Sequence, residues 1–300
     1  MAQMSFGVLG ALQVRRDGAA LPVGPPRQRS LLALLLARAG EATTLHEVVD
    51  VLWSESPPLS AVNLVRRYVG ELRRLLEPGL PTLAAGRWLL GQAGTYRLAI
   101  PDDHLDLVLF RRLRAEARDH CRQGEYRQGA ERYVQGLLLW RGPAAADVPS
   151  EVRCHPVFGA LDRERLATAK DAADAALRAG CGELVVDELY RIADYHPLDE
   201  ALQAKLMTAL TAAGNRAEAV AVYAGVRGRL REDLGIGPGP ELRAALRAAT
   251  APAATAPAAA PAATAPAAAP AAAGAGAAVT VVREHGRGAR QALWHRSVST

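Results

Sequence analysis

One stretch, residues 60–76 (SAVNLVRRYVGELRRLL), limits the folds open to this chain more than any other. Apolar side chains recur in it every three or four residues, which predicts an amphipathic helix with one buried face. The residues expected to face the core are Ala61, Val65, Tyr68, Val69, Leu72 and Leu76. Ser60 is a good N-cap, and Pro78-Gly79 predicts an end to the helix near Glu77.

The opposite stripe of this helix has the chemistry of a DNA-reading surface. Its members are Asn63, Arg66, Arg67, Gly70 and Arg74, with Arg73 near the edge. Arginine forks suit guanine and phosphate, an asparagine amide suits adenine, and a glycine lets the backbone approach a duplex. A solvated face is the other interpretation, because Glu71 lies four residues after Arg67 and three before Arg74. Taken alone, the helix leaves both interpretations open.

The segments around this helix predict a winged helix. The expected elements are a strand at Phe6–Val14, a turn at Arg15–Gly18, a short strand at Leu21–Val23, helices from Pro25-Pro26 to Gly40 and from Leu45 to Trp53, a loop at Ser54–Pro58, and a hairpin within 83–100. The hairpin favours DNA binding over a solvated helix face, because Arg87 and Arg97 flank it as a wing requires. Arg27 and Arg29 begin the first helix, where phosphates bind helix N-termini.

The remainder of the chain predicts helices and then a linker. Glycine and proline breaks divide residues 105–248 into helices, two pairs of which resemble degenerate tetratricopeptide repeats. Residues 251–278 are almost purely Ala, Pro and Thr. The expected organisation is a mainly α chain with a winged-helix DNA-binding domain at 1–100, an all-α tetratricopeptide-like domain at 101–249, an Ala/Pro-rich linker at 250–278 and a disordered basic tail at 279–300. Trp140 and Tyr223 are expected in the core.

Charge and motifs exclude several classes of protein. Residues 1–100 hold eleven Arg against seven Asp or Glu, so much of the net charge of +5 lies there. Three scattered cysteines support neither a disulfide framework nor a zinc site. His46-Glu47 is followed by Asp50 where a zinc motif needs histidine, and residues 235–240 (GIGPGP) lack phosphate-loop spacing. We therefore expect no enzyme, catalytic residue, metal or cofactor. With no signal peptide or membrane span in view, we expect a cytoplasmic protein without a membrane partner.

At these residues the sequence resembles the Streptomyces antibiotic regulatory protein family, in which an OmpR-type winged helix precedes a bacterial transcriptional activator domain. The matching stretches, in order, are FGVLGALQV, PPRQRSLLALLL, LWSESPP, NLVRRYVGELRRLL, GTYRL, LDLVLFRRL, LLLWRGPA, HPLDEALQAKLMTAL and GNRAEAVAVYAGVRGRLREDLGIGPGPELRAA. They span about residues 5–248, which is the whole two-domain arrangement.

The resemblance implies a sequence-specific activator of a secondary-metabolite gene cluster. It further implies a homodimer on direct repeats of double-stranded DNA, and contact with RNA polymerase through its sigma factor. Carried over by position, Asn63, Arg66 and Arg67 lie in the groove and Arg73 and Arg74 near phosphates. The polymerase-contacting loop comprises Trp53, Ser54, Glu55, Ser56, Pro57 and Pro58. Glu71 and Gly70 depart from the family pattern, which puts the target sequence in doubt.

Two alternatives stay open. One is a non-enzymatic tetratricopeptide-like scaffold whose winged helix has lost DNA affinity and binds protein, motivated by Glu71 near the groove-facing stripe. A steep salt dependence of binding separates this from a DNA reader, because only phosphate contacts release counterions. The other is a sensor whose helical domain binds a small molecule, which is compatible with either function.

Overall fold

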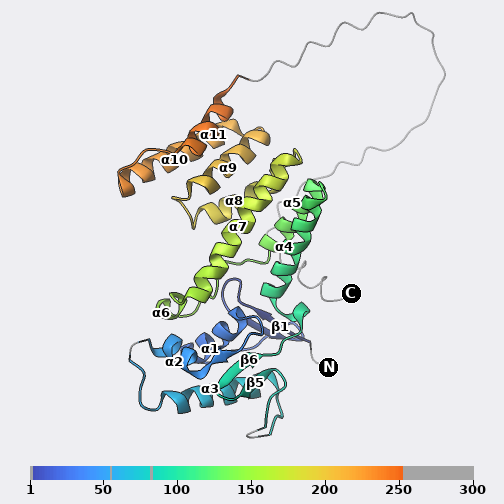
Figure 1. The fold of residues 1–300 in the computed structure, drawn as a ribbon, viewed down its shortest axis with the longest axis vertical. Coiled ribbons are helices and arrows are strands. Elements are labelled where there is room, and N and C mark those ends of the chain that lie inside the picture. The colour runs from blue at the N-terminus through green and yellow to red at the C-terminus, as the bar shows by residue number, and fades with distance from the viewer. Residues whose placement is uncertain (1–2, 55, 82–83, 253–300) are drawn as a thin grey trace, which may run out of the picture. The chain divides into compact units, whose positions relative to one another are not determined.

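The computed structural model describes residues 3–54, 56–81 and 84–252, and Met1–Ala249 form one compact unit (Figure 1). Within it, helices predominate, and two small antiparallel sheets belong to the first hundred residues. The mainly α fold with an N-terminal winged helix is therefore confirmed. The expected linker and tail lie outside the described residues, apart from Thr250–Pro252.

The first sheet consists of β1 (Met4–Gly7), β2 (Gln13–Arg16) and β3 (Ala19–Ala20), in that order. The prediction of one strand from Phe6 to Val14 is wrong, because the apolar run supplies parts of two antiparallel strands that pair Phe6 with Val14. The short returning strand is Ala19–Ala20 and not Leu21–Val23. Periodicity could not show this break, since the residues between β1 and β2 are also apolar and bury against the rest of the fold.

Three helices follow: α1 (Pro26–Ala37), α2 (Leu45–Trp53) and α3 (Ala61–Leu76). The bounds of α2 are as predicted, whereas α1 ends before Gly40 because Ala39 takes a positive φ of 48°. The six side chains buried on α3 are the six expected from the sequence. Ser60 occupies the N-cap position, but its hydroxyl makes no capping hydrogen bond.

The predicted hairpin forms the second sheet, with β5 (Leu89–Gln92) and β6 (Thr95–Leu98) joined by a two-residue turn. Ala93 and Gly94 both have positive φ, of 47° and 77°, as a tight hairpin turn requires. The sequence analysis missed β4 (Thr43–Thr44), which pairs with β6 and joins the hairpin to the start of α2. Two residues are too few to show a strand periodicity.

From Asp102 onwards, the described residues of the compact unit form helices and the loops that join them, without strands, as predicted. The elements are η1 (Asp102–His104), α4 (Asp106–Arg122), α5 (Tyr126–Leu137), α6 (Ser150–Arg153), α7 (Pro156–Arg178), η2 (Gly182–Leu184), α8 (Val186–Ala193), α9 (Glu200–Ala212), α10 (Arg216–Leu234) and α11 (Pro240–Thr250). The two expected pairs are α4 with α5 and α9 with α10, and each pair is packed together. Gly235 ends α10 in the left-handed conformation, and Pro240 begins α11.

A buried carboxylate joins the winged helix to the helical region. Asp106 is 1% exposed and accepts the N–H groups of Val8 and Leu9, at 2.9 and 3.2 Å. Arg141 donates to the same carboxylate at 3.0 Å, while its own N–H donates to the carbonyl of Leu9. Burial raises the pKa of Asp106, and Arg141 and the two backbone donors act in the opposite direction.

Gly10 is required at this junction for two reasons. Its φ of +132° is rarely adopted by residues with side chains, and an added Cβ would lie 2.8 Å from Cβ of Arg141. The close approach lets Ala145 and Ala146 donate to the carbonyls of Val8 and Gly10. The turn between β1 and β2 is thus hydrogen-bonded to the loop that follows α5, and the two regions share one continuous core.

Trp140 is fully buried as expected, with its ring edge-on to Phe110 at 5.4 Å. Tyr223 is partly buried against the core. Among the helices described, none is both long and apolar enough to cross a bilayer.

Candidate nucleic-acid interface

The outer face of α3 carries the predicted basic stripe. Asn63, Arg66, Arg67 and Arg74 are exposed, on the side of the helix opposite its buried residues. Gly70 is partly exposed at the middle of the stripe, and a Cβ added there would meet no atom within 4 Å. The structure therefore brings these five residues together on one open surface.

The arginines of this stripe differ in their partners. Arg67 lies 3.7 Å from the carboxylate of Glu71, and its guanidinium is 5.4 Å from the ring centre of Tyr68. Its side chain is still 59% exposed, so the contact holds it loosely. Within the described part of the chain, Arg66 and Arg74 make no hydrogen bond or ion pair. Their guanidinium groups are free to meet an anionic partner.

Arg73 has a structural contact that the sequence did not reveal. Its Nε donates to the carbonyl of Leu89 at 2.9 Å, and its side chain also lies close to Gly86 and Gly91. An added Cβ at Gly91 would be 3.2 Å from a guanidinium nitrogen of Arg73. Arg73 therefore fixes the hairpin against α3, and its reach to a phosphate stays a prediction.

Two further residues hold α3 in place and were missed by the sequence analysis. Arg16, on β2, donates to the carbonyls of Leu75 and Leu76, in the last turn of the helix, where carbonyl groups have no partner within the helix itself. Glu77 accepts the N–H of Trp88 at 3.0 Å, at the start of the hairpin. No local pattern indicates either contact, because the partners are 59 and 11 residues apart.

The hairpin presents the two arginines expected of a wing. Arg87 is exposed just before β5, with its guanidinium 5.2 Å from the ring centre of the buried Trp88. Arg97 is exposed on β6, and Gln92 and Thr95 flank the turn. Since β5 follows α3 and is tied to it through Arg73, both arginines are carried by a strand pair with a fixed orientation relative to the helix.

The start of α1 is the third basic region. Arg27 is exposed and its guanidinium lies 5.4 Å from the ring centre of Trp53. Arg29 is partly buried, and its Nε has no hydrogen-bond partner within the described structure. The first turn of α1 has no acidic residue, and no side chain caps it. Because Pro26 has no N–H group and Arg29 donates its own to the carbonyl of Pro25, an anion at this end could meet the N–H groups of Arg27 and Gln28.

The loop between α2 and α3 is the predicted polymerase-contacting segment. Trp53 is partly buried, Ser54 has a positive φ of 50°, and Glu55 lies outside the described residues. Ser56, Pro57 and Pro58 are exposed. Next to them are two apolar side chains open to solvent, Leu59 at 110% and Val62 at 38% of full exposure. Both apolar side chains are accessible to a partner molecule.

Comparisons with known proteins identify a family for the helical region and relatives for most of the chain. Residues 105–249 match the family model described as Bacterial transcriptional activator domain. Regulatory protein AfsR of Streptomyces coelicolor is 36% identical over 267 residues, which cover 84% of this chain and 26% of that protein. Regulatory protein DnrI of Streptomyces peucetius is 29% identical over 248 residues, covering 80% of this chain and 89% of DnrI. These relatives are named as regulators.

A solved structure has the same fold over most of the compact unit. It is Mycobacterium tuberculosis EmbR in complex with a low-affinity phosphopeptide, and the superposition has a TM-score of 0.69 at 31% sequence identity. The match covers 83% of this chain and 65% of the EmbR chain. The chain thus spans about a quarter of AfsR and about two thirds of EmbR, so each relative has regions with no counterpart in the match.

Proposed function

Because the chain belongs to the Streptomyces antibiotic regulatory protein family, we propose that it regulates transcription by reading double-stranded DNA with the outer face of α3. The observation that carries this proposal is the open stripe of Asn63, Arg66, Arg67, Gly70 and Arg74. An α-helix fits the major groove, and its side chains there meet a different set of donors and acceptors at each base pair.

The residues of the stripe take different roles. Arg66 and Arg67 read guanine through their forked donors, and Asn63 reads adenine through its amide. Each such contact is worth about 1–3 kcal/mol of discrimination against the wrong base. Gly70 keeps the middle of α3 free of a side chain, which allows the helix backbone to approach the duplex.

The backbone of the DNA is held on both sides of α3. Arg74 and Arg73 reach phosphates from the helix itself, and Arg87 and Arg97 do so from the hairpin. Arg27 and Arg29 contact a phosphate at the open N-terminus of α1. Phosphate contacts fix the register of a protein on the duplex without reading sequence.

The protein activates a biosynthetic gene cluster and binds direct repeats as a homodimer, without enzyme activity of its own. It contacts RNA polymerase through the loop at residues 53–59. Support for the loop comes from the exposed Leu59 and the neighbouring Val62. If this loop touches polymerase, Leu59→Ser leaves DNA affinity unchanged and abolishes activation in a transcription assay with purified polymerase. Equal activation by the variant and the parent protein would remove the loop from the proposal.

Selection of genomic DNA fragments by the purified protein tests the function as a whole. We expect enriched fragments that share a repeated motif, and we expect Arg66→Ala/Arg67→Ala to lose that enrichment. A matched control is Arg127→Ala/Arg132→Ala on α5, which removes the same charge from side chains that pair with Glu131 and Glu116. The control should enrich the same fragments as the parent protein.

The competing function is a scaffold that binds protein through the helical region. The contact between Arg67 and Glu71 favours it, because an ion pair on the reading face reduces the charge offered to DNA. No enrichment of fragments by the parent protein, or enrichment untouched by the double substitution on α3, would replace the DNA-reading proposal with this one.

A further inference from the structure

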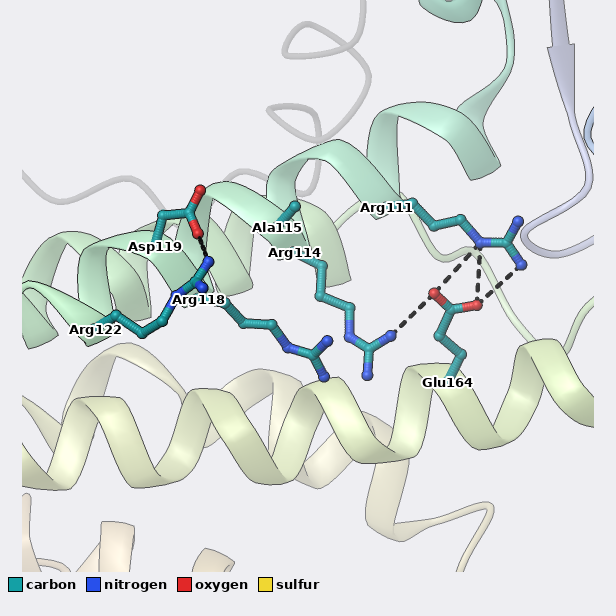
Figure 2. Close-up of a pocket in the computed structure, with 7 residues that line it drawn as sticks. All are labelled: Arg111, Arg114, Ala115, Arg118, Asp119, Arg122 and Glu164. Carbon is teal, nitrogen blue, oxygen red and sulfur yellow. Dashed lines mark hydrogen bonds and ion pairs between the residues drawn. The ribbon is translucent and has the colours of Figure 1, made fainter.

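A second arginine stripe lies on α4, away from the surface proposed to read DNA. Arg111, Arg114, Arg118 and Arg122 recur at three- and four-residue spacing and therefore share one face of the helix. They line a cleft of about 440 Å³ together with Ala115, Asp119 and Glu164. Figure 2 shows Arg114 and Arg118 reaching from α4 towards α7 and Glu164 extending back from α7. The volume is in the range of sites that hold small molecules.

The cleft is rich in positive charge. Four guanidinium groups line it against the carboxylates of Glu164 and Asp119, and Asp171 pairs with Arg118, which leaves a formal balance of +1. Glu164 is shared, because Arg111 donates to it at 3.1 and 3.2 Å and Arg114 donates at 3.1 Å. One carboxylate thus serves two arginines.

The arginines are held in position before any ligand arrives. Arg118 lies 3.4 Å from the carboxylate of Asp171, on α7. Arg122 pairs with Asp119 on its own helix. Arg114 is only 18% exposed, and its Nε is buried with no hydrogen-bond partner in the described structure. A preorganised site loses less conformational entropy when it binds.

We propose that the cleft between α4 and α7 binds a small molecule that carries a diphosphate group. Arginine forks match phosphoryl oxygens with two parallel hydrogen bonds, and guanidinium groups stay charged at any physiological pH. A single carboxylate on a ligand presents two acceptor oxygens, whereas a diphosphate presents oxygens on two phosphoryl groups and can meet more than one guanidinium group at once. The ligand's remaining atoms lie towards the open side of the cleft, where Arg122 is 77% exposed.

Glu164 acts as the resident competitor of this ligand. Its carboxylate occupies donors of Arg111 and Arg114, so a diphosphate must share or displace those hydrogen bonds. This arrangement separates the proposal from a purely structural role for the ion pairs. If the pairs only fasten α4 to α7, the parent protein, with Glu164 in place, binds no phosphate-containing anion in the cleft. If the cleft is a ligand site, the parent protein binds such an anion, and removal of the Glu164 charge strengthens that binding.

The test is calorimetric titration of the full chain with inorganic pyrophosphate and, separately, with ADP, at constant ionic strength. We expect one site per chain, and we expect Arg114→Gln/Arg118→Gln to weaken binding by about tenfold or more, because charge-assisted donors are lost. Glu164→Gln should tighten binding by roughly threefold to tenfold, since it removes one repelling charge from the site. Tighter binding of ADP than of pyrophosphate would show that the organic part of the ligand adds to the affinity.

Arg127→Gln/Arg132→Gln is the matched control, because these arginines lie on α5 in pairs with Glu131 and Glu116. It should bind both probes as the parent protein does. Circular dichroism of each variant shows whether it folds, and Glu164→Gln gives an independent readout if the arginine variant does not. The proposal is overturned if neither probe binds at concentrations up to about 10 mM. A dissociation constant at that limit corresponds to a free energy of binding of about −2.7 kcal/mol. Equal weakening in the control variant, or no gain with Glu164→Gln, would also overturn it.

Discussion

Two helices of this protein, α3 and α4, each present arginines on one face. On α3, Arg66 and Arg74 make no ion pair within the described residues, and Arg67 meets only Glu71 of its own helix. On α4, each of the four arginines of the cleft is paired with a carboxylate. The same residue type is open on one helix and engaged on the other.

The difference arises from the acidic residues of other segments. Glu164 and Asp171, which pair with α4, belong to α7 and lie about 50 residues later in the chain. No acidic side chain from another element pairs with the arginines of the α3 stripe in the described structure. The open charge of α3 suits a polyanion such as DNA, whereas α4 suits a compact ligand that can outcompete a carboxylate.

The largest expected effect is the difference between a double arginine substitution on α3 and one on α4. Arg66→Ala/Arg67→Ala should cost about 2–6 kcal/mol of DNA affinity, from two base contacts of about 1–3 kcal/mol each. Its free energy of unfolding should change by less than about 0.5 kcal/mol, because both side chains are exposed. Arg114→Ala/Arg118→Ala should leave DNA affinity unchanged and lower stability. Fluorescence anisotropy measures the DNA affinity, and urea denaturation measures the free energy of unfolding. An equal loss of DNA affinity in both variants would show that the α3 and α4 arginines do not differ in their contribution to DNA binding.

Glu164→Ala tests whether the ion pairs of α4 stabilise the fold. It leaves Arg111 and Arg114 without their shared partner, and the carboxylate it removes is only 18% exposed. We expect the free energy of unfolding to fall by about 1–3 kcal/mol, between the values for exposed and buried ion pairs. The exposed Glu131→Ala serves as the control and should lie within about 0.5 kcal/mol of the parent protein. Identical urea midpoints for Glu164→Ala and the parent would show that the pairs on α4 contribute nothing.

Arg97→Ala tests whether the wing adds to the charge that α3 offers. Loss of one phosphate contact should reduce the slope of log K against log salt by about 0.9, with a similar loss on every DNA sequence. Arg112→Ala removes an exposed arginine that pairs with Asp103 at 2.6 Å, and it should leave the slope unchanged. An unchanged slope for Arg97→Ala would remove the hairpin from the interface.

The smallest expected effect concerns Glu71, the only acidic residue on α3. Glu71→Ala frees Arg67 from its exposed ion pair, which is worth about 0.3–0.5 kcal/mol. DNA affinity should therefore rise slightly, while stability falls by a similar amount. A loss of affinity would mean that Glu71 itself contacts the DNA, for example as an acceptor from cytosine.

Much of the winged helix could be predicted because its signals are local. The six buried residues of α3 follow from helical periodicity, and the bounds of α2 from its apolar spacing. The hairpin follows from the turn residues 91–94 (GQAG) between 88–90 (WLL) and 95–98 (TYRL). Arg66 and Arg74 lie on the side of α3 opposite its buried residues. Their exposure, and with it the central part of the proposed interface, could therefore also be predicted from the sequence.

The contacts that fix these parts together could not be predicted, because their partners lie far apart in the chain. Asp106 looks like an ordinary residue at a helix start, and nothing nearby indicates that it accepts N–H groups of Val8 and Leu9. The structural role of Arg73 depends on the carbonyl of Leu89. The α4 cleft required the position of Glu164 on α7. Each is a consequence of tertiary packing and not of local pattern.

The central claim is that arginines of α3 read guanines in the major groove. Methylation interference on a selected fragment tests it most directly, because methylation of guanine N7 blocks the acceptor that an arginine fork uses. We expect modification of a few guanines in each repeat to abolish binding, and Arg66→Ala to become indifferent to one of them. Binding that tolerates N7 methylation at every guanine of the fragment would contradict the claim.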